Sequence, residues 1–143
     1  MASYVKINDW VANLGEVADL DGDTFAVALS NTAPGSEDPA PTADGQGILA
    51  NVTQIAYDNC SARALTTASH AQTGGTFTLD FNDLVLTASG DVGPFQYVYV
   101  YDDTPETPAD PLVCYFDYGS AITLHNGETL TITFNASGLF TIA

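Results

Sequence analysis

The alternating run FQYVYVY at residues 95–101 constrains the fold more than any other part of the chain. Successive side chains of a β-strand point to opposite faces, so a strand here places four aromatic rings on one face and two valines on the other. The rings belong to Phe95, Tyr97, Tyr99 and Tyr101, and the valines are Val98 and Val100. A strand that is apolar on both faces lies in the middle of a sandwich or contacts another subunit.

The next apolar run, PLVCYFDY at residues 111–118, is the expected antiparallel partner of this strand. The segment between the two runs, DDTPETPAD at residues 102–110, combines prolines with acids. Such a composition is typical of a long solvated loop, and no set of nucleophile, base and orienting group accompanies it. The pattern therefore indicates a pair of strands joined by a loop rather than the wall of an active site.

The rest of the chain contains further short runs with the period of a β-strand. FAVAL at residues 25–29 alternates large and small apolar residues, which favours a half-buried strand. Other strands are expected in the segments TFTLDF, LVLTAS, AITL, TLTITF and GLFTIA. Asn126 and Gly127 lie between AITL and TLTITF, and Asn-Gly is the strongest hairpin signal in the chain. About eight strands at this spacing predict a single antiparallel β-sandwich domain, jelly-roll-like, over residues 1–143.

Residues 1–15 are expected to form an N-terminal helix or arm. In the segment INDWVANLG, Asn8 is a suitable N-cap, Asp9 favours the first turn and Gly15 suits the C-terminal cap. A lone helix of about two turns is not stable in water. Trp10 should therefore pack this helix against the rest of the domain or against a neighbouring subunit.

Residues 31–47 are rich in proline, glycine and acids and contain almost no large apolar residue. This composition predicts a long surface loop, which is a candidate for contact with a partner. The segment GILANVTQIAY that follows, at residues 47–57, is ambiguous. Its apolar residues Ile48, Val52 and Ile55 fit either one helical turn or an irregular edge.

The charge of the chain is far from balanced. Its 143 residues include 18 acids and two basic residues, Lys6 and Arg63, which gives a formal net charge of −16. Two basic side chains cannot form the basic surface that phosphate contacts require, which argues against nucleic acid and against an anionic membrane as partners. Three explanations of the acidity stay open: it keeps the domain soluble, it suits a saline milieu, or it complements a basic partner surface.

Neither the cysteines nor the N-terminus carries a signature of secretion. Cys60 and Cys114 form no C-x-x-C motif, and a domain of this size needs no disulfide, so two free thiols are favoured over one disulfide. The opening MASYVKINDW lacks a basic stretch followed by a long apolar one, and no run reaches the ~20 apolar residues of a membrane span. We therefore expect a soluble chain that is made in the cytoplasm.

The motif DLDGD, with Asp19, Asp21 and Asp23 at alternate positions, suggests a calcium-binding loop. An EF-hand loop also needs a glycine at its sixth position and a glutamate at its twelfth. Those positions hold Thr24 and Ser30 here, so the EF-hand pattern fails. The three acids remain a weak calcium candidate beside the more common interpretation as acidic turns.

Sequence evidence for other metal sites or for catalytic residues is equally weak. Asp102, Asp103 and Glu106 are a second weak calcium candidate, again less favoured than plain acidic turns. The two histidines, His70 and His125, have no His or Cys at metal-ligand spacing. Composition permits a Ser-His-Asp triad or a pair of glycosidase carboxylates, but no GxSxG motif occurs and the acids gather in polar turns. We expect no cofactor and no enzymatic activity.

Several pieces of the chain together resemble a family of small virion proteins of tailed bacteriophages. They are YVKINDWVANLGE, FAVALSNTAPG, TASGDVGPFQYVYVYDDT, PLVCYFDYGSAITLHNGETLTITF and GLFTIA. The resemblance keeps this order and spans nearly the whole chain, and its most specific pieces are SNTAP, GPFQYVYVYDDT and DYGSAITLHNGE. The acidic segment GSEDPAPTADGQG and the cysteines depart from the family pattern.

The resemblance implies a structural virion protein without a catalytic motif, most specifically a head decoration (cement) protein. Its expected partners are the major capsid protein and copies of itself, as a trimer on the exterior of the capsid, after synthesis in the cytoplasm of a bacterial host. Because Tyr and Trp combine apolar area with a polar atom, we expect contacts between subunits at four residues. These are Trp10, Tyr97, Tyr99 and Tyr101. The alternatives are a tail, neck or fibre-base component, or a carbohydrate-binding β-sandwich with the same rings as stacking platforms.

Overall fold

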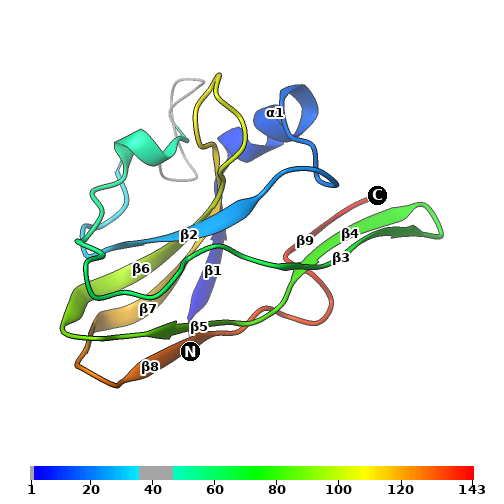
Figure 1. Cartoon of the computed structure of the whole chain (residues 1–143). Coiled ribbons are helices and arrows are strands. Elements are labelled where there is room, and N and C mark those ends of the chain that lie inside the picture. The colour runs from blue at the N-terminus through cyan, green and yellow to red at the C-terminus, as the bar shows by residue number, and fades with distance from the viewer. Residues whose placement is uncertain (1, 36–46) are drawn as a thin grey trace.

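The computed structural model describes residues 2–35 and 47–143, and this part of the chain is mainly β (Figure 1). All strand pairs are antiparallel, and one short α-helix lies near the N-terminus, which confirms the predicted fold class. The elements in chain order are β1 (Ser3–Lys6), α1 (Asp9–Glu16), β2 (Phe25–Ser30), the 3-10 helix η1 (Leu49–Asn51), β3 (Thr67–Thr73), β4 (Thr76–Phe81), β5 (Leu84–Thr87), β6 (Val92–Asp102), β7 (Leu112–Leu124), β8 (Thr129–Ile132) and β9 (Phe140–Ile142).

The largest sheet has the strand order β1-β7-β6-β2. Its centre is the predicted pair β6 and β7, in which Tyr99 lies opposite Tyr115 and Val98 lies opposite Phe116. The acidic segment after Asp102 forms the connection between them, as the sequence indicated. Residues directly opposite in an antiparallel pair share a face, so the tyrosines occupy one face of this sheet and the valines the other.

The two smaller sheets, β3-β4-β9 and β5-β8, lie across from one face of the large sheet (Figure 1). Aromatic rings join the two layers. Phe25 of the large sheet lies 5.3 Å from the ring of Phe81 in β4, measured between ring centres. Phe116 of β7 lies 6.1 Å from Phe134, which follows β8. Because these edge-to-face and tilted contacts fill the space between the sheets, the core of the domain lies there.

Strand β2 is buried along its whole length, whereas its alternation predicted a half-buried strand. It is the last strand of its sheet, but the chain returns along its outer edge. The backbone N–H of Leu65 donates to the carbonyl of Phe25 over 2.8 Å, and that of Ile55 donates to the carbonyl of Leu29 over 3.0 Å. Ala26 and Ala28 lie opposite Tyr101 and Tyr99 of β6, and both alanines are buried. The returning segment carries no strand pattern of its own.

The Asn126-Gly127 turn forms, but it does not make the predicted hairpin. Gly127 has a φ of 85°, as such turns require. The strand before the turn, β7, pairs with β6 and β1, while the strand after it, β8, pairs with β5. The turn therefore carries the chain from one sheet to the other. It is held there by Ala88, whose carbonyl accepts the N–H of Gly127 over 2.8 Å.

The N-terminal segment contains a strand as well as the expected helix. Strand β1 pairs with β7 and precedes α1, which extends through Gly15 to Glu16. Strand β3 was also missed, because it consists mainly of small and polar residues that are largely exposed and show no apolar period.

Cys60 and Cys114 are free thiols, as predicted. Burial raises the pKa of the Cys114 thiol, so Cys114 stays protonated and packs as a small apolar side chain. The loop predicted at residues 31–47 falls mostly outside the described residues.

Replacing Gly93 with Ala should destabilise the domain by about 1–3 kcal/mol. Gly93 has a φ of 120°, and a Cβ added there would lie 2.6 Å from the carbonyl oxygen of Ile122. Gly15 is the control, because a Cβ there meets nothing within 4 Å and Ala favours a helix by about 1 kcal/mol over Gly. Urea unfolding would measure both variants, and equal stability of Gly93→Ala and Gly15→Ala would contradict this account of strand β6.

Candidate functional site

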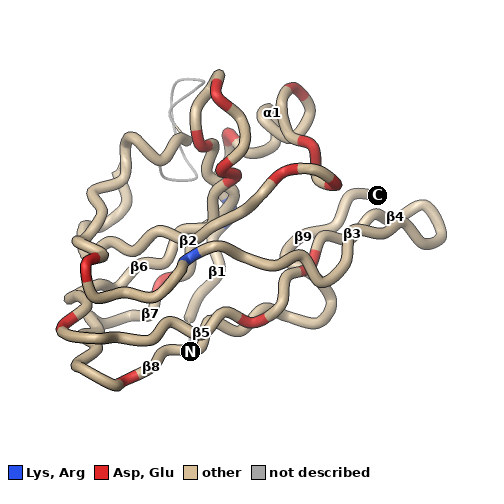
Figure 2. The backbone as a smooth tube through the Cα atoms, viewed as in Figure 1, with Lys and Arg blue, Asp and Glu red and all other residues tan. Residues whose placement is uncertain are grey.

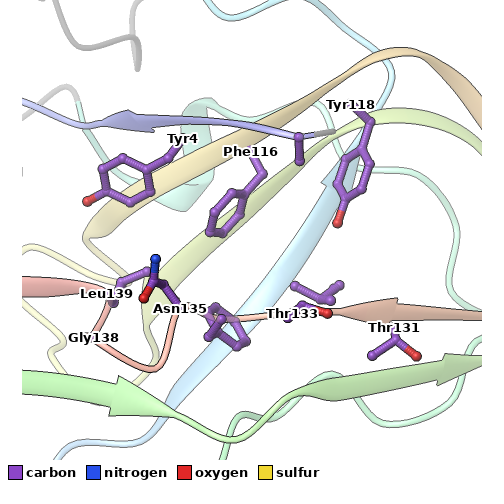
Figure 3. A pocket seen from close by; sticks show the side chains of 11 residues that line it. Tyr4, Phe116, Tyr118, Thr131, Thr133, Asn135, Gly138 and Leu139 are labelled. Carbon is purple, nitrogen blue, oxygen red and sulfur yellow. The ribbon is translucent and has the colours of Figure 1, made fainter.

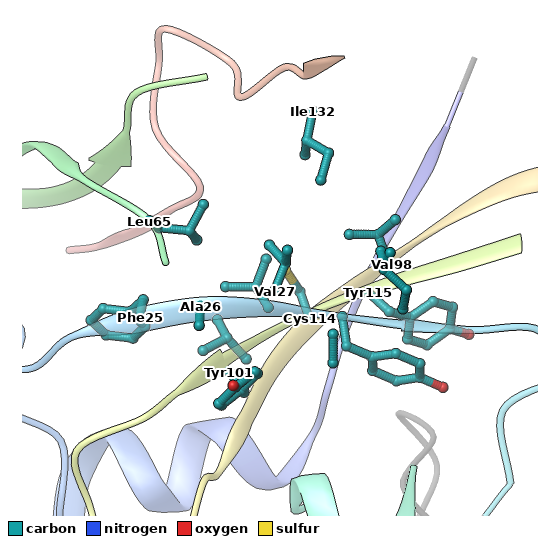
Figure 4. Close-up of a cluster of buried hydrophobic side chains, with 14 of the residues drawn as sticks. Phe25, Ala26, Val27, Leu65, Val98, Tyr101, Cys114, Tyr115 and Ile132 are labelled. Atoms are coloured by element: carbon teal, nitrogen blue, oxygen red, sulfur yellow. The ribbon is translucent and has the colours of Figure 1, made fainter. Parts of the chain in front are cut away.

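Three of the four residues expected at an interface are buried inside the single chain. Tyr99 is 0% exposed, Trp10 is 2% exposed and Tyr101 is 6% exposed. In the single chain, Trp10, Tyr99 and Tyr101 therefore leave almost no ring surface for the expected contacts with another subunit. Figure 4 shows Tyr101 and Tyr115 among the buried side chains of the large sheet. Only Tyr97 keeps part of its ring accessible.

Contacts with other elements explain the burial of Trp10 and Tyr101. Trp10 makes edge contacts with Phe25 at 6.3 Å and with Phe140 at 6.0 Å between ring centres, so it docks α1 on the core. Tyr101 hydrogen-bonds Arg63, whose guanidinium also lies 3.7 Å from the centre of the Tyr57 ring. The segment that returns along β2 thus brings a cation and a further ring over the tyrosine face.

A different group of aromatic residues borders a groove at the opposite side of the sheet. Tyr4 of β1 is 43% exposed, and it makes an edge contact with Phe116 at 5.7 Å between ring centres. Tyr118 of β7 continues the row (Figure 3). The facing wall is formed by residues 131–135 with Gly138 and Leu139, and the volume of the groove is about 590 Å³. This volume falls within the range of roughly 300–1,000 Å³ that is usual for ligand pockets.

The groove is electrically neutral in a strongly acidic chain. None of its lining residues is charged, and its polar groups are hydroxyls and amides such as those of Thr131, Thr133 and Asn135. Burial raises the pKa of the Tyr4 and Tyr118 hydroxyls, so both phenols remain uncharged at neutral pH. The groove therefore suits an uncharged occupant that offers apolar surface together with hydrogen-bonding groups.

One wall of this groove could have been predicted in part from the sequence. Phe116 and Tyr118 alternate along β7 with the residues that face the tyrosines of β6, so they belong to the opposite face. Tyr4 was missed because it lies in the short strand before α1. The contribution of the 131–139 segment depends on how the two layers approach each other, which no local pattern indicates.

The acids of the DLDGD motif mainly stabilise their own turn. The Oδ1 atom of Asp19 accepts the backbone N–H groups of Asp21 and Gly22, each over 3.1 Å. The Oδ2 atom of Asp23 accepts the N–H of Asp19 over 2.8 Å. Within residues 2–35 and 47–143, no three His, Cys, Asp or Glu side chains converge in a way that could hold a metal ion. The three acids do not form the calcium loop considered from the sequence.

The structure instead brings the two acidic loops together. The backbone N–H of Thr24 donates to the hydroxyl of Thr104 over 2.8 Å, and the N–H of Asp103 donates to the carbonyl of Thr24 over 2.8 Å. These bonds place the carboxyl group of Asp23 beside that of Asp102. One acid from each of the two weak calcium candidates thus reaches the same place. Figure 2 shows acidic segments gathered at this end of the molecule, near α1 and the loop after β6.

Asp102 is an unusual aspartate because its side chain is fully buried. Its Oδ1 atom accepts the N–H of Thr104 over 3.3 Å, whereas its Oδ2 atom has no donor among the described residues. Burial, followed by the adjacent carboxyl group of Asp23, raises the pKa of Asp102 to about 8. Because its pKa lies at about 8, the carboxyl group of Asp102 holds a proton at neutral pH.

Both histidines lie beside aspartates at the surface. The Nδ1 atom of His70 is 3.2 Å from Oδ1 of Asp21, and that of His125 is 2.8 Å from Oδ1 of Asp91. The hydrogen bond and the charge of Asp91 raise the pKa of His125. These exposed pairs contribute little to stability, and neither histidine lines the groove or reaches the Asp23–Asp102 pair.

Comparison with protein-family models, with curated proteins and with solved structures found no match to this chain. In the part of the chain that the structure describes, no helix has the length and apolar character needed to span a membrane. Two features of the described residues are candidate sites: the neutral aromatic groove beside β1, and the buried carboxyl group of Asp102 with its neighbour Asp23.

Proposed function

We propose that this chain is a structural virion protein of a tailed bacteriophage that decorates and stabilises the capsid. It binds the major capsid protein and copies of itself, as a trimer on the outer surface of the head, and it acts by contact rather than by catalysis. The sequence resemblance, which spans nearly the whole chain, supports this assignment. The neutral groove that borders an edge strand supports it from the structure.

The groove carries the proposal because it lies beside an available strand edge. Strand β1 pairs with β7 on one side, and among the described residues no strand pairs with its other side. An extended segment of a partner can add to such an edge through main-chain hydrogen bonds while one of its apolar side chains fills an adjacent pocket. The contact surface is therefore assigned to the rings of Tyr4, Phe116 and Tyr118 instead of the buried rings of β6.

The distribution of charge fits this orientation. The formal net charge is −16, yet the lining of the groove carries no charged residue. A neutral contact surface avoids the cost of desolvating charges, while acids elsewhere keep decorated particles from associating. The acidic loops near Asp102 would then face the solvent.

Replacing Tyr4 with Ala should weaken binding to phage particles that lack this protein by roughly 5–30-fold, the effect of losing about 1–2 kcal/mol at an aromatic contact. Tyr97→Ala is the matched control, because it removes a partly accessible tyrosine from outside the groove. Co-sedimentation with particles would measure both affinities. Normal binding of Tyr4→Ala together with weak binding of Tyr97→Ala would assign the contact to the wrong surface.

The location on the head is tested separately by removing the gene from the phage. Virions without the protein should lose infectivity at lower temperature than complete virions, and cryo-electron microscopy of complete virions should show its density on the capsid. Density at the tail or neck would support the alternative of a tail, neck or fibre-base component. Unchanged heat stability, with no density on the head, would refute decoration.

A carbohydrate-binding module is the second candidate, and the composition of the groove favours it. Exposed Tyr4 and partly exposed Tyr118 offer ring surface, and Thr131, Thr133 and Asn135 add hydroxyl and amide groups. Neutral sugars are recognised by this combination of an apolar surface and a few polar groups. Titration with neutral oligosaccharides distinguishes the two candidates, since saturable binding that Tyr118→Ala abolishes would favour the module.

A further inference from the structure

We propose that the free edge of β1 and the adjacent groove bind an extended peptide segment in which an acidic residue stands two positions before an apolar one. The segment adds to β1 as an antiparallel strand, so that its apolar side chain lies beside Tyr4 and its carboxylate lies beside Lys6. This inference rests on the proposed function, because it specifies which segment of a partner protein that surface receives. It adds the direction, the register and the sequence pattern of the segment.

The main-chain groups of β1 alternate between β7 and the free edge. Ile7, directly after the strand, donates its N–H to the carbonyl of Val113 over 3.1 Å. Because hydrogen-bonded and non-hydrogen-bonded residues alternate in an antiparallel pair, Val5 is bonded to β7 in the same way as Ile7. The N–H and C=O groups of Tyr4 and Lys6 therefore point away from β7. Within residues 2–35 and 47–143, no hydrogen-bond partner meets these outward groups.

The side chains of the same two residues lie on the groove side of β1. Tyr4 lines the groove, and Lys6, two positions further along the strand, shares its face. Residues directly opposite each other in an antiparallel pair also share a face, so the partner residue opposite Tyr4 directs its side chain into the groove. The partner residue opposite Lys6 comes two positions earlier in the partner sequence, because the two strands run in opposite directions.

The facing wall of the groove offers no comparable edge, because N–H groups of the segment after β8 are already engaged. The N–H of Phe134 donates to Oδ1 of Asp83 over 3.0 Å. The N–H of Leu139 donates to the carbonyl of Leu79 over 2.7 Å. This wall therefore contributes side chains that surround the apolar group of the partner, and the main-chain contacts belong to β1.

Lys6 determines the charge of the partner residue opposite it. It is exposed, whereas the other basic residue, Arg63, is engaged by the carbonyl of Val27 and the ring of Tyr57. The ion pairs of the described residues join histidines to aspartates, so Lys6 has no carboxylate partner among them. Opposite charges directly across an antiparallel pair attract each other. Repulsion by acids farther than about 10 Å away is largely screened at an ionic strength of about 0.1 M.

A second copy of the chain is the competing occupant of this edge, and its charge argues against it. Each copy has a formal net charge of −16, so two copies repel each other. In addition, β1 contains no acid, so β1 of a second copy offers Lys6 no carboxylate. We therefore assign the edge to a different protein.

The test is an NMR titration of the ¹⁵N-labelled protein with the synthetic peptide acetyl-Thr-Glu-Thr-Leu-Thr-Val-Thr-amide. In the proposed register its Leu lies opposite Tyr4 and its Glu lies opposite Lys6. We expect saturable shifts and slowed hydrogen exchange at the amides of Tyr4 and Lys6, whereas the amide of Val5 is already protected by β7. The peptide of reversed sequence has the same composition and should bind roughly fivefold or more weakly.

Two N-methylated forms of the peptide separate main-chain pairing from side-chain docking. Methylation of the Leu nitrogen removes the donor to the carbonyl of Tyr4 and should weaken binding roughly tenfold. The nitrogen of the Thr between Glu and Leu points away from β1, so its methylation should change the affinity by about twofold or less. Equal effects of the two methyl groups would contradict strand addition.

A charge exchange tests the contact with Lys6. The variant Lys6→Glu should bind the peptide roughly fivefold more weakly, and a peptide that carries Lys in place of its Glu should restore the affinity. The NMR spectrum shows directly whether the variant is folded. Failure of the exchange to restore binding would refute the proposed register.

Three further results would overturn the inference. They are equal binding of the reversed peptide, no saturable shift at Tyr4 and Lys6 with millimolar peptide, and shifts of these amides with protein concentration alone, which would assign the edge to a second copy. None of these measurements needs phage particles. Loss of peptide binding with normal, Tyr4-dependent binding to particles would refute only this inference, and peptide binding without particle binding would refute only the proposed function.

Discussion

Replacing Tyr99 with Ala is expected to lower the free energy of unfolding of the isolated protein by about 3–5 kcal/mol, the usual cost of removing a buried aromatic ring. Tyr99 is 0% exposed and lies 5.3 Å from the ring of Tyr115, measured between ring centres. Its partner in the neighbouring strand β2 is Ala28, a residue too small to fill the space that the ring would leave. Urea unfolding of the purified protein measures this loss without any partner present.

The variant Tyr97→Ala is the matched control for Tyr99→Ala. Both tyrosines belong to one face of β6, but Tyr97 is only half-buried and should cost about 1 kcal/mol or less. If Tyr99→Ala left the stability of the isolated protein unchanged and abolished binding to particles, the ring would be an interface residue. That result would restore the interpretation that the sequence suggested and contradict the packing described above.

Replacing Asp102 with Asn should stabilise the protein above pH 8, by about 1–3 kcal/mol. The Asn amide keeps an oxygen to accept the N–H of Thr104 and adds an N–H that can donate to the carboxylate of Asp23. It therefore supplies the donor that the Oδ2 atom of Asp102 lacks, without changing the volume of the side chain.

The dependence on pH follows from the raised pKa of Asp102. An unfolded aspartate titrates near pH 3.9, whereas Asp102 titrates at about 8 in the folded protein, so the folded state binds more protons between these values. The stability from the protonated pair is complete below about pH 4 and is lost as the pH rises to 8. Asp102→Asn should lack this decline.

Asp58→Asn controls for the general effect of removing one negative charge from an acidic protein. It should keep the decline of stability between pH 4 and pH 8, because Asp58 is exposed and lies outside the pair. Chemical unfolding at a series of pH values compares the three proteins. Parallel curves for Asp102→Asn and the natural protein would show that Asp102 does not carry the buried proton.

The sequence predicted most of the strands because their signal is local. Alternation in the segments of β2, β4 and β6 placed these strands correctly, and the apolar run PLVCYFDY predicted the first part of β7. The segment AITL, expected as a separate strand, is the end of β7. The acidic connection between β6 and β7 followed from its composition. The predicted free thiols of Cys60 and Cys114 were also confirmed. Strands β1 and β3 were missed, since one is short and the other is polar and largely exposed.

The candidate sites depend on contacts between distant segments, which the sequence did not indicate. The two apolar faces of β6 fitted either a central strand or an interface with another subunit. The segment that brings Tyr57 and Arg63 to the tyrosine face has no regular sequence pattern. Asp23 and Asp102 are far apart in the chain and adjoin only because the two loops hydrogen-bond each other. The groove likewise requires the 131–139 segment to approach Tyr4 and Phe116 across the gap between the layers.

Hydrogen–deuterium exchange of the protein, free and bound to phage particles, tests most directly whether the groove rather than the tyrosine strand makes the contact. The account predicts that amides of β6 exchange slowly in both states, and that amides of β1 and residues 131–139 become protected only on the particle. Rapid exchange of β6 in the free protein, with new protection there and none in β1 upon binding, would contradict it.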